Sequence, residues 1–356
     1  MRILHILNSL TNKGNGIVNV TVDLAAEQVK NGHMVLIVAG TGEYSALLPE
    51  LGVQYWYLDQ RISAWNLVKS TASLYRIIQA FRPDVLHAHM RTSLVLAWLC
   101  SRLPRRPLVA HLHNVHDPES AMMRIADRVI AVSHSVRDTM KRSIPAAIFR
   151  VVLNGPLQSA RTPLFTTIAP VPLQRPAITT VAGLNHRKGI ADLLEAFELV
   201  LLRVPDAHLY LVGDGPERVL LEASARQSSH STQIHFEGWQ AEPKGYLMMT
   251  DVFVLASHRD SLGLVLLEAR EAGCAIVATD VDGIPEALDG GAAGVLVPAR
   301  TPIVLADAIS SLLLDPSLKK EWQHKAREGI ENFTCARMTS EIQTIYVELI
   351  SSLRRR

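Results

Sequence analysis

The sequence predicts an α/β fold of two doubly wound, Rossmann-like domains that face each other across a cleft. The chain has 356 residues, 48% of them apolar, which is enough for two domains of ordinary size, each with its own core. Short apolar runs alternate with helical stretches, as is typical of parallel sheets with crossover helices. A stretch rich in Pro and Thr and without periodicity interrupts this alternation and predicts a linker at 161–177.

The first domain, 1–160, is predicted from its apolar runs and helical patterns. Strands are expected at 3–7, 34–39, 54–58, 85–89, 108–113 and 129–133, and helices at 17–30, 65–80, 93–101 and 134–142. Gly14 and Gly16 in the first strand-to-helix turn let the backbone approach a ligand closely, although an ordinary tight turn is the alternative. A dinucleotide fingerprint needs a third Gly where Asn19 stands, which disfavours NAD.

Histidines gather at the ends of two expected strands. His87 and His89 share a strand face, and so do His111 and His113, because residues two apart in a strand point the same way. This spacing alone is compatible with zinc. No acidic pattern accompanies it, so histidines satisfied inside a parallel sheet are the favoured interpretation, and no metal site is predicted.

The second domain, 178–335, repeats the alternation, and a last helix is expected at 336–356. Strands are expected at 178–182, 209–212, 234–236, 252–256, 275–279 and 294–297, and helices at 189–203, 216–227, 263–272 and 302–314. The first turn places Arg187 and Lys188 just before a helix. Cations there oppose the helix dipole, which favours a diphosphate bound between them over side chains that simply face solvent.

The stretch from Ser257 to Glu286 combines two carboxylates with the start of a helix. Asp260 lies on the loop where the helix begins, and Glu268 lies two turns further along. The helix opens with the amides of Gly263, Leu264 and Val265, which are expected to be unpaired and, with the positive end of the dipole, to attract an anion. The carboxylates are expected to hold hydroxyl groups near that anion.

This stretch resembles the signature of family 4 glycosyltransferases, which are retaining nucleotide-sugar enzymes of the two-domain GT-B fold. The family pattern reads E-G-F-G-L-V-x-x-E and later G-G-x-P-E. The matching positions are Gly263, Leu264, Val265, Glu268, Gly283, Pro285 and Glu286. The departures are Asp260 for Glu, Ser261 for Gly, Leu262 for Phe and Asp282 for Gly. The side chain of Asp260 is one methylene shorter than that of the usual Glu, so the resemblance does not determine which donor sugar is bound.

The resemblance also implies roles for single residues. Arg187 and Lys188 would bind the donor diphosphate, Asp260 the sugar hydroxyls and Glu268 the ribose hydroxyls. A family histidine that lies near the donor sugar is best matched by His113, with His116 as the competing assignment.

Three further assignments follow from the same resemblance. Gly238 and Trp239 would line the base pocket, with plain packing as the alternative for Trp239. Gly14 and Gly16 would lie near the donor phosphates or the acceptor. The last helix, 336–356, would cross back to the first domain.

The activity implied is metal-independent, retaining transfer of a sugar from a UDP- or GDP-sugar to a glycan or lipid-linked acceptor, with no cofactor. Two alternatives stay open. One is a nucleotide-sugar epimerase of the same fold, and the other is a catalytically silent subunit that binds sugar nucleotides.

Charge is distributed unevenly along the chain. Residues 1–165 hold 18 Lys and Arg against 10 Asp and Glu, whereas 166–356 hold 18 against 24. The basic half is compatible with a phosphate-bearing acceptor or a peripheral contact with the inner face of a membrane, and equally with complementarity between domains. Nucleic acid is disfavoured because the basic pairs are short and lack interleaved aromatics.

Compartment is predicted from the N-terminus and the cysteines. No run approaches 18 uncharged apolar residues, and the N-terminal run reads as a first strand rather than a cleavable leader, so a cytoplasmic protein is expected. Cys100, Cys274 and Cys335 have no metal-ligand or disulfide spacing, which predicts free buried thiols.

Overall fold

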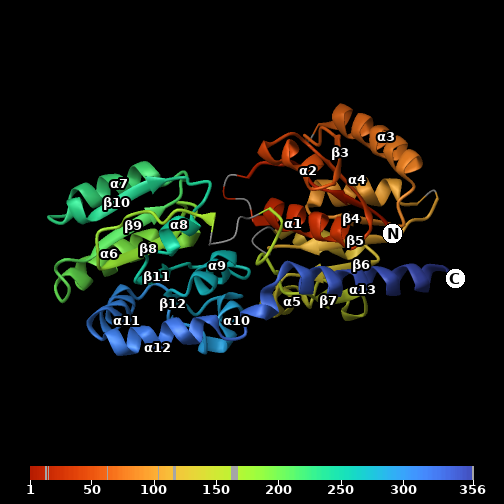
Figure 1. The fold of residues 1–356 in the computed structure, drawn as a ribbon. Coiled ribbons are helices and arrows are strands. Elements are labelled where there is room, and N and C mark those ends of the chain that lie inside the picture. The colour runs from red at the N-terminus through yellow and green to blue at the C-terminus, as the bar shows by residue number, and fades with distance from the viewer. Residues whose placement is uncertain are drawn as a thin grey trace. The chain divides into compact units, whose positions relative to one another are not determined.

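The computed structural model describes residues 1–12, 14, 16–61, 63–102, 104–114, 118–161 and 167–354. The chain divides into two compact units, 1–162 with 333–356 and 163–332. Each unit is built on one sheet of parallel strands with helices on both faces (Figure 1). The predicted α/β class with two doubly wound domains is therefore confirmed.

Unit 1, formed by 1–162 and 333–356, has a seven-stranded sheet of order β3-β2-β1-β4-β5-β6-β7. Its strands are β1 (Arg2–Ile6), β2 (Met34–Ala39), β3 (Gln54–Tyr57), β4 (Val85–Ala88), β5 (Leu108–Leu112), β6 (Arg128–Ala131) and β7 (Phe149–Val151). Its helices are α1 (Gly16–Lys30), α2 (Leu47–Glu50), α3 (Ala64–Phe81), α4 (Arg91–Cys100), α5 (His134–Met140) and α13 (Cys335–Arg354). Strand β7 was not predicted because three residues carry no readable period.

The two faces of this sheet differ in chemistry. Leu4 and Ile6 of β1 point into an apolar core that α3 and α4 complete. His5 points the other way, toward α1 and α13, which pack beside each other. The C-terminal helix is therefore part of unit 1, and it covers a face lined by histidines.

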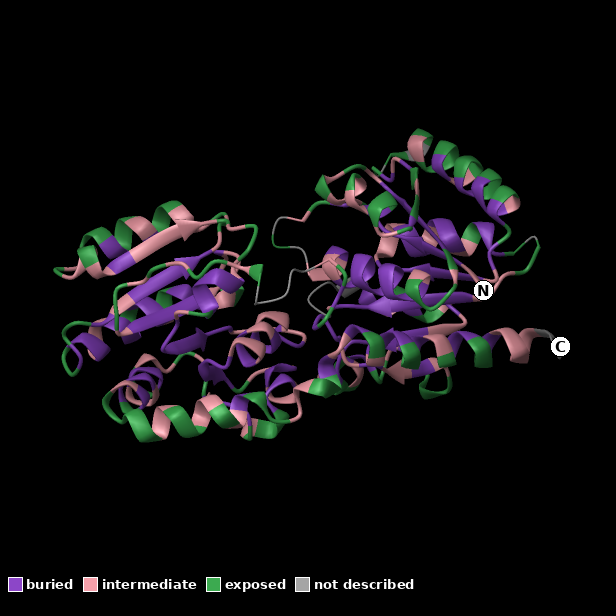
Figure 2. Ribbon diagram, in the orientation of Figure 1, coloured by how far each residue is buried: buried purple, intermediate pink, exposed green. Residues whose placement is uncertain are grey.

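Unit 2, formed by 163–332, has a six-stranded sheet of order β10-β9-β8-β11-β12-β13. Its strands are β8 (Ala177–Val181), β9 (His208–Val212), β10 (Ile234–Gly238), β11 (Val252–Leu255), β12 (Ala275–Thr279) and β13 (Val295–Val297). Its helices are α6 (Ile190–Leu201), α7 (Arg218–Arg226), α8 (Lys244–Leu247), α9 (Leu264–Ala272), α10 (Ile284–Ala287), α11 (Pro302–Leu314) and α12 (Pro316–Arg327). Its central strands β8 and β11 are buried except for Val181 at the end of β8, and Figure 2 shows them mostly purple.

Strand order fixes where a ligand can bind in unit 2. In an open parallel sheet the loops that follow the strands gather at one edge, and ligands bind where the strand order reverses. That reversal lies between β8 and β11. The loops after these two strands carry Lys188 and Asp260, so the topology makes the two residues neighbours.

Candidate active site

The loops after β8 and β11 are joined backbone to backbone. The carbonyl oxygen of Arg187 accepts hydrogen bonds from the amides of His258 at 2.7 Å and Arg259 at 3.4 Å. Gly189 permits this close approach, because it has φ +61° and a Cβ there would lie 2.0 Å from the carbonyl oxygen of Ala256. The crossing places the side chain of Lys188 beside the loop that carries Asp260.

Lys188 and Asp260 form an ion pair at the end of the sheet. Lys188 Nζ lies 2.6 Å from Asp260 Oδ2, and the two side chains are 19% and 15% exposed. Burial alone would raise the pKa of Asp260, but Lys188 and the amides of Gly263 and Leu262 outweigh it and hold that pKa below its ordinary value. The carboxylate is therefore ionised at neutral pH and fixed in position.

The start of α9 differs from the prediction in one respect. The amide of Gly263, expected to be unpaired, donates to Asp260 Oδ1 at 2.9 Å. The reason is that Asp260 lies three residues upstream, where a short carboxylate caps the turn. The amides available for an anion are consequently those of Leu264 and Val265, in the first turn of the helix.

Glu268 lies on the same face of α9 as these amides. Leu264, Val265 and Glu268 are all of intermediate burial, whereas Leu266 and Leu267 between them are buried. Residues three and four apart in a helix share a face, so Glu268 lies on the accessible face of α9, on the same side as Leu264 and Val265. This is the arrangement that the spacing of the motif predicts.

Asp282 supports the loop of Asp260. Its backbone has φ +47°, a left-handed conformation that Gly adopts freely and Asp tolerates better than most residues. Its carboxylate accepts hydrogen bonds from Arg259 Nε at 2.7 Å and from the amide of Asp260 at 3.1 Å. The sequence shows the departure from Gly at this position, but it does not show this supporting role.

Sequence reasoning also missed His258. This residue follows β11, and its Nε2 lies 2.8 Å from Oδ2 of Asp192 on α6. Its ring meets that of His186 edge-on at 5.3 Å between centroids. The available signal was that His186 directly precedes the cation pair in sequence and His258 lies two residues before Asp260.

The side chain of Arg187 is exposed and has no ion pair among the residues that the structure describes.

Gly238 and Trp239 lie at the same edge of the sheet but further away. Gly238 ends β10 with φ +71°, and Trp239 is 39% exposed. Strands β9 and β8 separate β10 from β11, so these residues are about 14 Å from the Asp260 loop by strand spacing. The structure brings together Lys188, Asp260 and the start of α9, and leaves the predicted base contacts at the periphery.

The predicted site residues of unit 1 lie around the end of its own sheet. Gly14 is exposed in the β1–α1 loop, and Gly16 begins α1. His113 directly follows β5, is 9% exposed, and has a pKa that burial lowers to about 3. His116, the competing assignment, lies outside the described residues.

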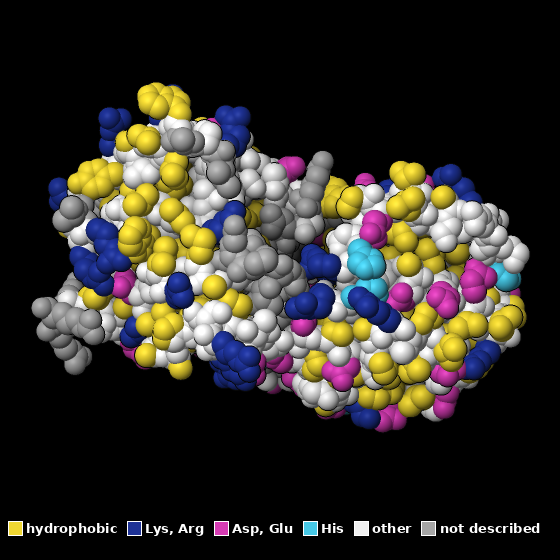
Figure 3. Space-filling view, turned by 180° about the vertical axis from the view of Figure 1, so that it is seen from behind, with side chains coloured by type: hydrophobic (Ala, Val, Ile, Leu, Met, Phe, Trp, Pro, Cys, Tyr) yellow, Lys and Arg dark blue, Asp and Glu magenta, His cyan; other side chains and the backbone are white. Residues whose placement is uncertain are grey.

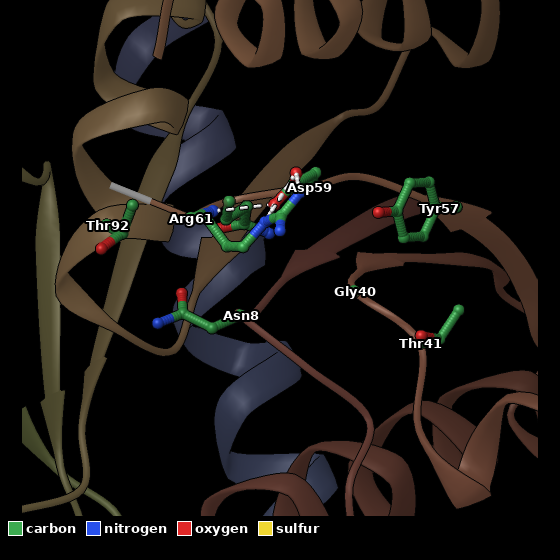
Figure 4. A pocket seen from close by; sticks show the side chains of 8 residues that line it. Asn8, Gly40, Thr41, Tyr57, Asp59, Arg61 and Thr92 are labelled. Carbon is green, nitrogen blue, oxygen red and sulfur yellow. Dashed lines mark hydrogen bonds and ion pairs between the residues drawn. The ribbon is translucent and has the colours of Figure 1, made fainter. Parts of the chain in front are cut away.

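A pocket of about 420 Å³ opens at the carboxyl ends of the first strands of unit 1. It is lined by Asn8, Gly40, Thr41, Tyr57, Asp59, Gln60, Arg61 and Thr92. In the view of Figure 4, the ion pair of Asp59 and Arg61, 2.7 Å long, lies between Thr92 on one side and Tyr57 on the other. Polar groups and an aromatic ring thus line the same pocket.

Two family models match nearly the whole chain in succession. The model described as "Glycosyltransferase Family 4" matches residues 14–155, and the one described as "Glycosyl transferases group 1" matches 167–329. An alignment with alpha-maltose-1-phosphate synthase of Mycolicibacterium smegmatis is 30% identical over 323 residues and covers 79% of this chain and 83% of that protein. The chain belongs to glycosyltransferase family 4.

Other relatives in the comparison share only part of their length with this family 4 chain. N-acetyl-alpha-D-glucosaminyl L-malate synthase of Bacillus anthracis is 34% identical over 48% of this chain and 45% of its own length. Glycogen synthase of Mycobacterium tuberculosis is 28% identical over 71% of this chain and 65% of its own. The chain therefore spans less than half of the first protein and about two thirds of the second.

Solved structures match the fold over the full length. A HepE structure from Anabaena, in complex with UDP, superposes with a TM-score of 0.82 at 20% identity and covers 98% of this chain and 100% of that one. Sucrose-phosphate synthase from Thermosynechococcus elongatus gives 0.82 at 19% identity, covering 99% and 100%. The fold is thus GT-B. Within the described residues, no helix has both the length and the apolar character required of a membrane span.

Proposed function

We propose that this protein is a retaining glycosyltransferase that moves a sugar from a nucleotide-sugar donor to a glycan or lipid-linked acceptor without a metal ion. The observation that carries the proposal is the grouping of Lys188, Asp260 and the start of α9 at the point where the strand order of unit 2 reverses. The family 4 match and the structures of HepE in complex with UDP and with UDP-glucose support it.

Departure of a nucleoside diphosphate requires its developing charge to be stabilised. Lys188, Arg187 and the amides of Leu264 and Val265 would do this, since all of them lie at the ends of β8 and β11. The ion pair with Asp260 fixes the position of the Lys188 ammonium group, and a bound diphosphate would be its second anionic partner. No step requires a nucleophilic side chain if the leaving phosphate accepts the proton of the acceptor hydroxyl.

The carboxylates would hold the donor's hydroxyl groups. Asp260 is ionised and fixed by Lys188 and Gly263, so its remaining acceptor capacity can be used by sugar hydroxyls. Glu268 lies two turns further along the chain and would hold the ribose. Gly238 and Trp239, at the end of β10, would contact a uracil or guanine base.

The unit 1 pocket is the proposed acceptor site. Its polar lining of Asn8, Thr92 and the Asp59–Arg61 pair suits a glycan, while the Tyr57 ring offers a stacking surface for a sugar. The loop at Asp59 is hydrogen-bonded to the start of α3, because Asn66 Nδ2 donates to the carbonyl oxygens of Asp59 and Arg61. An acceptor in the pocket would thus lie beside the surface of α3.

That surface is the proposed contact with an anionic membrane. On the exposed side of α3, Trp65 is 70% exposed, Val68 63% and Tyr75 42%, and Lys69 lies over the Trp65 ring. Aromatic and aliphatic side chains mixed with cations are typical of helices that lie in the interface of a bilayer. A lipid-linked acceptor would be presented at this side of unit 1.

The experiment is donor binding and transfer measured for Lys188→Ala and Arg187→Ala. We expect kcat/KM to fall by about 100-fold for Lys188→Ala, because a partly buried cation that meets a developing negative charge is lost, and less for the exposed Arg187. Lys320→Ala, an exposed cation on α12, is the matched control. Undiminished turnover in both variants would defeat the mechanism.

The same assay separates the alternatives. An epimerase would change the sugar of the donor without an acceptor, and a silent subunit would bind UDP or GDP saturably but turn over none of the donors offered. Either result would replace the proposed function.

A further inference from the structure

Five buried histidines line one face of the unit 1 sheet, and only one of them, His113, is among the predicted site residues. They are His5 of β1, His87 and His89 at the end of β4, and His111 and His113 at the end of β5. None is more than 9% exposed. His5 lies directly opposite His87 in the neighbouring strand, and ring centroids of successive pairs are 4.2 to 5.5 Å apart. The five rings therefore form one continuous cluster beneath α1 and α13.

Burial keeps these rings neutral. It lowers the pKa of His5 to about 4 and of His113 to about 3, and it holds the pKa of the other three well below the ordinary value. A neutral imidazole has one N–H donor and one bare nitrogen that accepts. In a row of neutral rings joined by hydrogen bonds, the tautomer of one ring therefore determines the tautomer of the next.

Three of the rings form such a row, which ends at an amide of α1. His5 Nε2 lies 2.8 Å from Gln28 Oε1, His5 Nδ1 lies 2.9 Å from His89 Nε2, and His89 Nδ1 lies 3.1 Å from His113 Nε2. An amide oxygen only accepts, so His5 donates to Gln28 from Nε2. His89 then donates to His5, and His113 donates to His89, each from Nε2. The bare nitrogen at the end of the row is His113 Nδ1.

The opposite direction would require the amide of Gln28 to be turned over, and the partner at the other end of that amide favours the direction given. The phenol of Tyr346 can donate to His87 Nδ1, which lies 2.5 Å from its oxygen. Tyr346 then accepts from Gln28 Nε2 at 3.5 Å. Both ends of the amide are satisfied in this direction.

We propose that Gln28 is a positioning residue that acts through His5 and His89, and that it holds His113 with Nδ1 bare to accept a hydrogen bond from a hydroxyl of the donor sugar. The inference rests on the proposed function and on the role near the donor sugar that the family resemblance implies for His113. The row itself does not depend on it. His111 takes no part, because both of its nitrogens are buried and have no hydrogen-bond partner among the described residues.

A metal ion is the competing occupant of this cluster. His5, His87 and His89 form one group whose ring nitrogens lie within 4.8 Å of one another, and His89, His111 and His113 form another. Neither group contains a carboxylate or thiolate to offset the charge of a buried cation. The two ring nitrogens of His89 also lie at hydrogen-bond distance from His5 and from His113, so the row is the favoured arrangement.

The experiment is nuclear magnetic resonance of the full chain labelled with ¹⁵N-histidine. Hydrogen bonds between ring nitrogens give direct ¹⁵N–¹⁵N couplings, and the shifts show which nitrogen carries the proton. We expect couplings from His113 Nε2 to His89 Nδ1 and from His89 Nε2 to His5 Nδ1. Gln28→Met should abolish this single order, Gln28→Glu should keep it because a carboxylate also accepts, and His111→Phe should leave it unchanged.

Kinetics with the same variants test the link to the donor. Gln28→Met should raise the KM for the donor by up to about tenfold with kcat nearly unchanged, the effect of losing one hydrogen bond present in both ground and transition states, and Gln28→Glu should restore it. Absent couplings, a proton on His89 Nδ1, or a stoichiometric metal by elemental analysis would each overturn the row whether or not the protein is an enzyme. Couplings as expected with an unaltered donor KM would overturn the contact with the donor.

Discussion

Asp260 forms an ion pair and caps a helix with the same carboxylate. Its Oδ2 pairs with Lys188, and its Oδ1 caps the amide of Gly263. Asp260→Asn keeps the shape of the side chain but removes the charge, so kcat/KM should fall by about 100-fold. The free energy of unfolding should also fall, because the partly buried Lys188 loses its ionised partner. Asp206→Asn, an exposed acid at the opposite edge of the sheet, is the control.

Asp260→Glu installs the acid usual in the family and separates the two roles. The longer side chain would extend toward the proposed diphosphate site but would accept the hydrogen bond of the Gly263 amide less well. The free energy of unfolding should therefore fall by about 1 kcal/mol. The preference among donor sugars should change, measured as the ratio of kcat/KM values across UDP- and GDP-sugars. An unchanged ratio would show that Asp260 does not contact the sugar.

The left-handed backbone conformation of Asp282 leads to a prediction about stability. Its left-handed φ costs free energy that Gly would avoid, whereas its carboxylate gains hydrogen bonds from Arg259 and the amide of Asp260. Asp282→Ala loses the hydrogen bonds and keeps the strain, so it should be less stable than Asp282→Gly by about 1 kcal/mol. Urea unfolding of the two variants measures the difference. Equal unfolding midpoints and slopes for the two variants would show that the backbone at position 282 is not strained.

Residues of the site were predictable where a local pattern encodes them. Asp260 and Glu268 lie in one short segment of the sequence, and so do the two cations before α6. The structure places each of these segments where the pattern predicts. The ion pair of Lys188 with Asp260 joins positions 72 apart in sequence. Its existence depends on strand order, as do the contacts of His258 and Asp282, so no local pattern could have shown them.

At the scale of elements, long periodic segments were predictable and short ones were not. Every strand predicted has a counterpart in the sheets, with ends that agree within two residues. Helices α2, α8 and α10 span four residues each and β7 spans three, so none contains enough residues for a period to be recognised. These segments owe their conformation to the neighbours that they pack against.

The amino-terminal edge of the unit 2 sheet depends on one buried carboxylate. Asp251, just before β11, accepts hydrogen bonds from Arg175 Nε at 2.9 Å, Lys319 Nζ at 2.7 Å and the amide of Ala177 at 2.9 Å. Burial would raise its pKa, but these partners outweigh burial and lower the pKa to about 2. The contacts join β8, β11 and α12 at the edge opposite the candidate site.

This carboxylate gives unit 2 a defined pH dependence. Because the pKa of Asp251 is lower in the folded state than in the unfolded chain, its contribution is complete above about pH 4 and is lost as pH falls to about 2. Asp251→Asn should lower the free energy of unfolding at pH 7 by about 2 kcal/mol and remove that part of the acid dependence. Urea titrations at pH 7 and pH 3 measure both effects. An equal loss at the two pH values would contradict this origin.

At the scale of the whole molecule, the uneven charge has a visible counterpart. On the face drawn in Figure 3, dark blue side chains predominate over unit 1 and magenta ones over unit 2. The cations Arg61, Lys69 and Arg76 accompany the exposed apolar residues at the start and along the outer side of α3. Figure 2 shows the same helix exposed along its outer side and buried along its inner one.

This surface predicts binding to vesicles that contain anionic lipid. Trp65 and Val68 would enter the interface, and the cations would attract the headgroups, so binding should weaken when salt is raised to about 0.5 M and the screening length falls below about 5 Å. Trp65→Ser combined with Val68→Ser should lower the partition coefficient by at least about tenfold, because both side chains lose apolar burial. Co-sedimentation with vesicles measures both effects.

The control lies on unit 2, where apolar side chains are equally exposed but the charge has the opposite sign. Val219 and Leu220 of α7 are 76% and 72% exposed. Replacing both with Ser removes comparable apolar surface and should leave vesicle binding unchanged, because the surrounding unit is acidic and repels anionic lipid. If the α7 variant lost binding as strongly as the α3 variant, apolar exposure alone would drive the contact. The basic half of the chain would then need another partner, such as a phosphate-bearing acceptor.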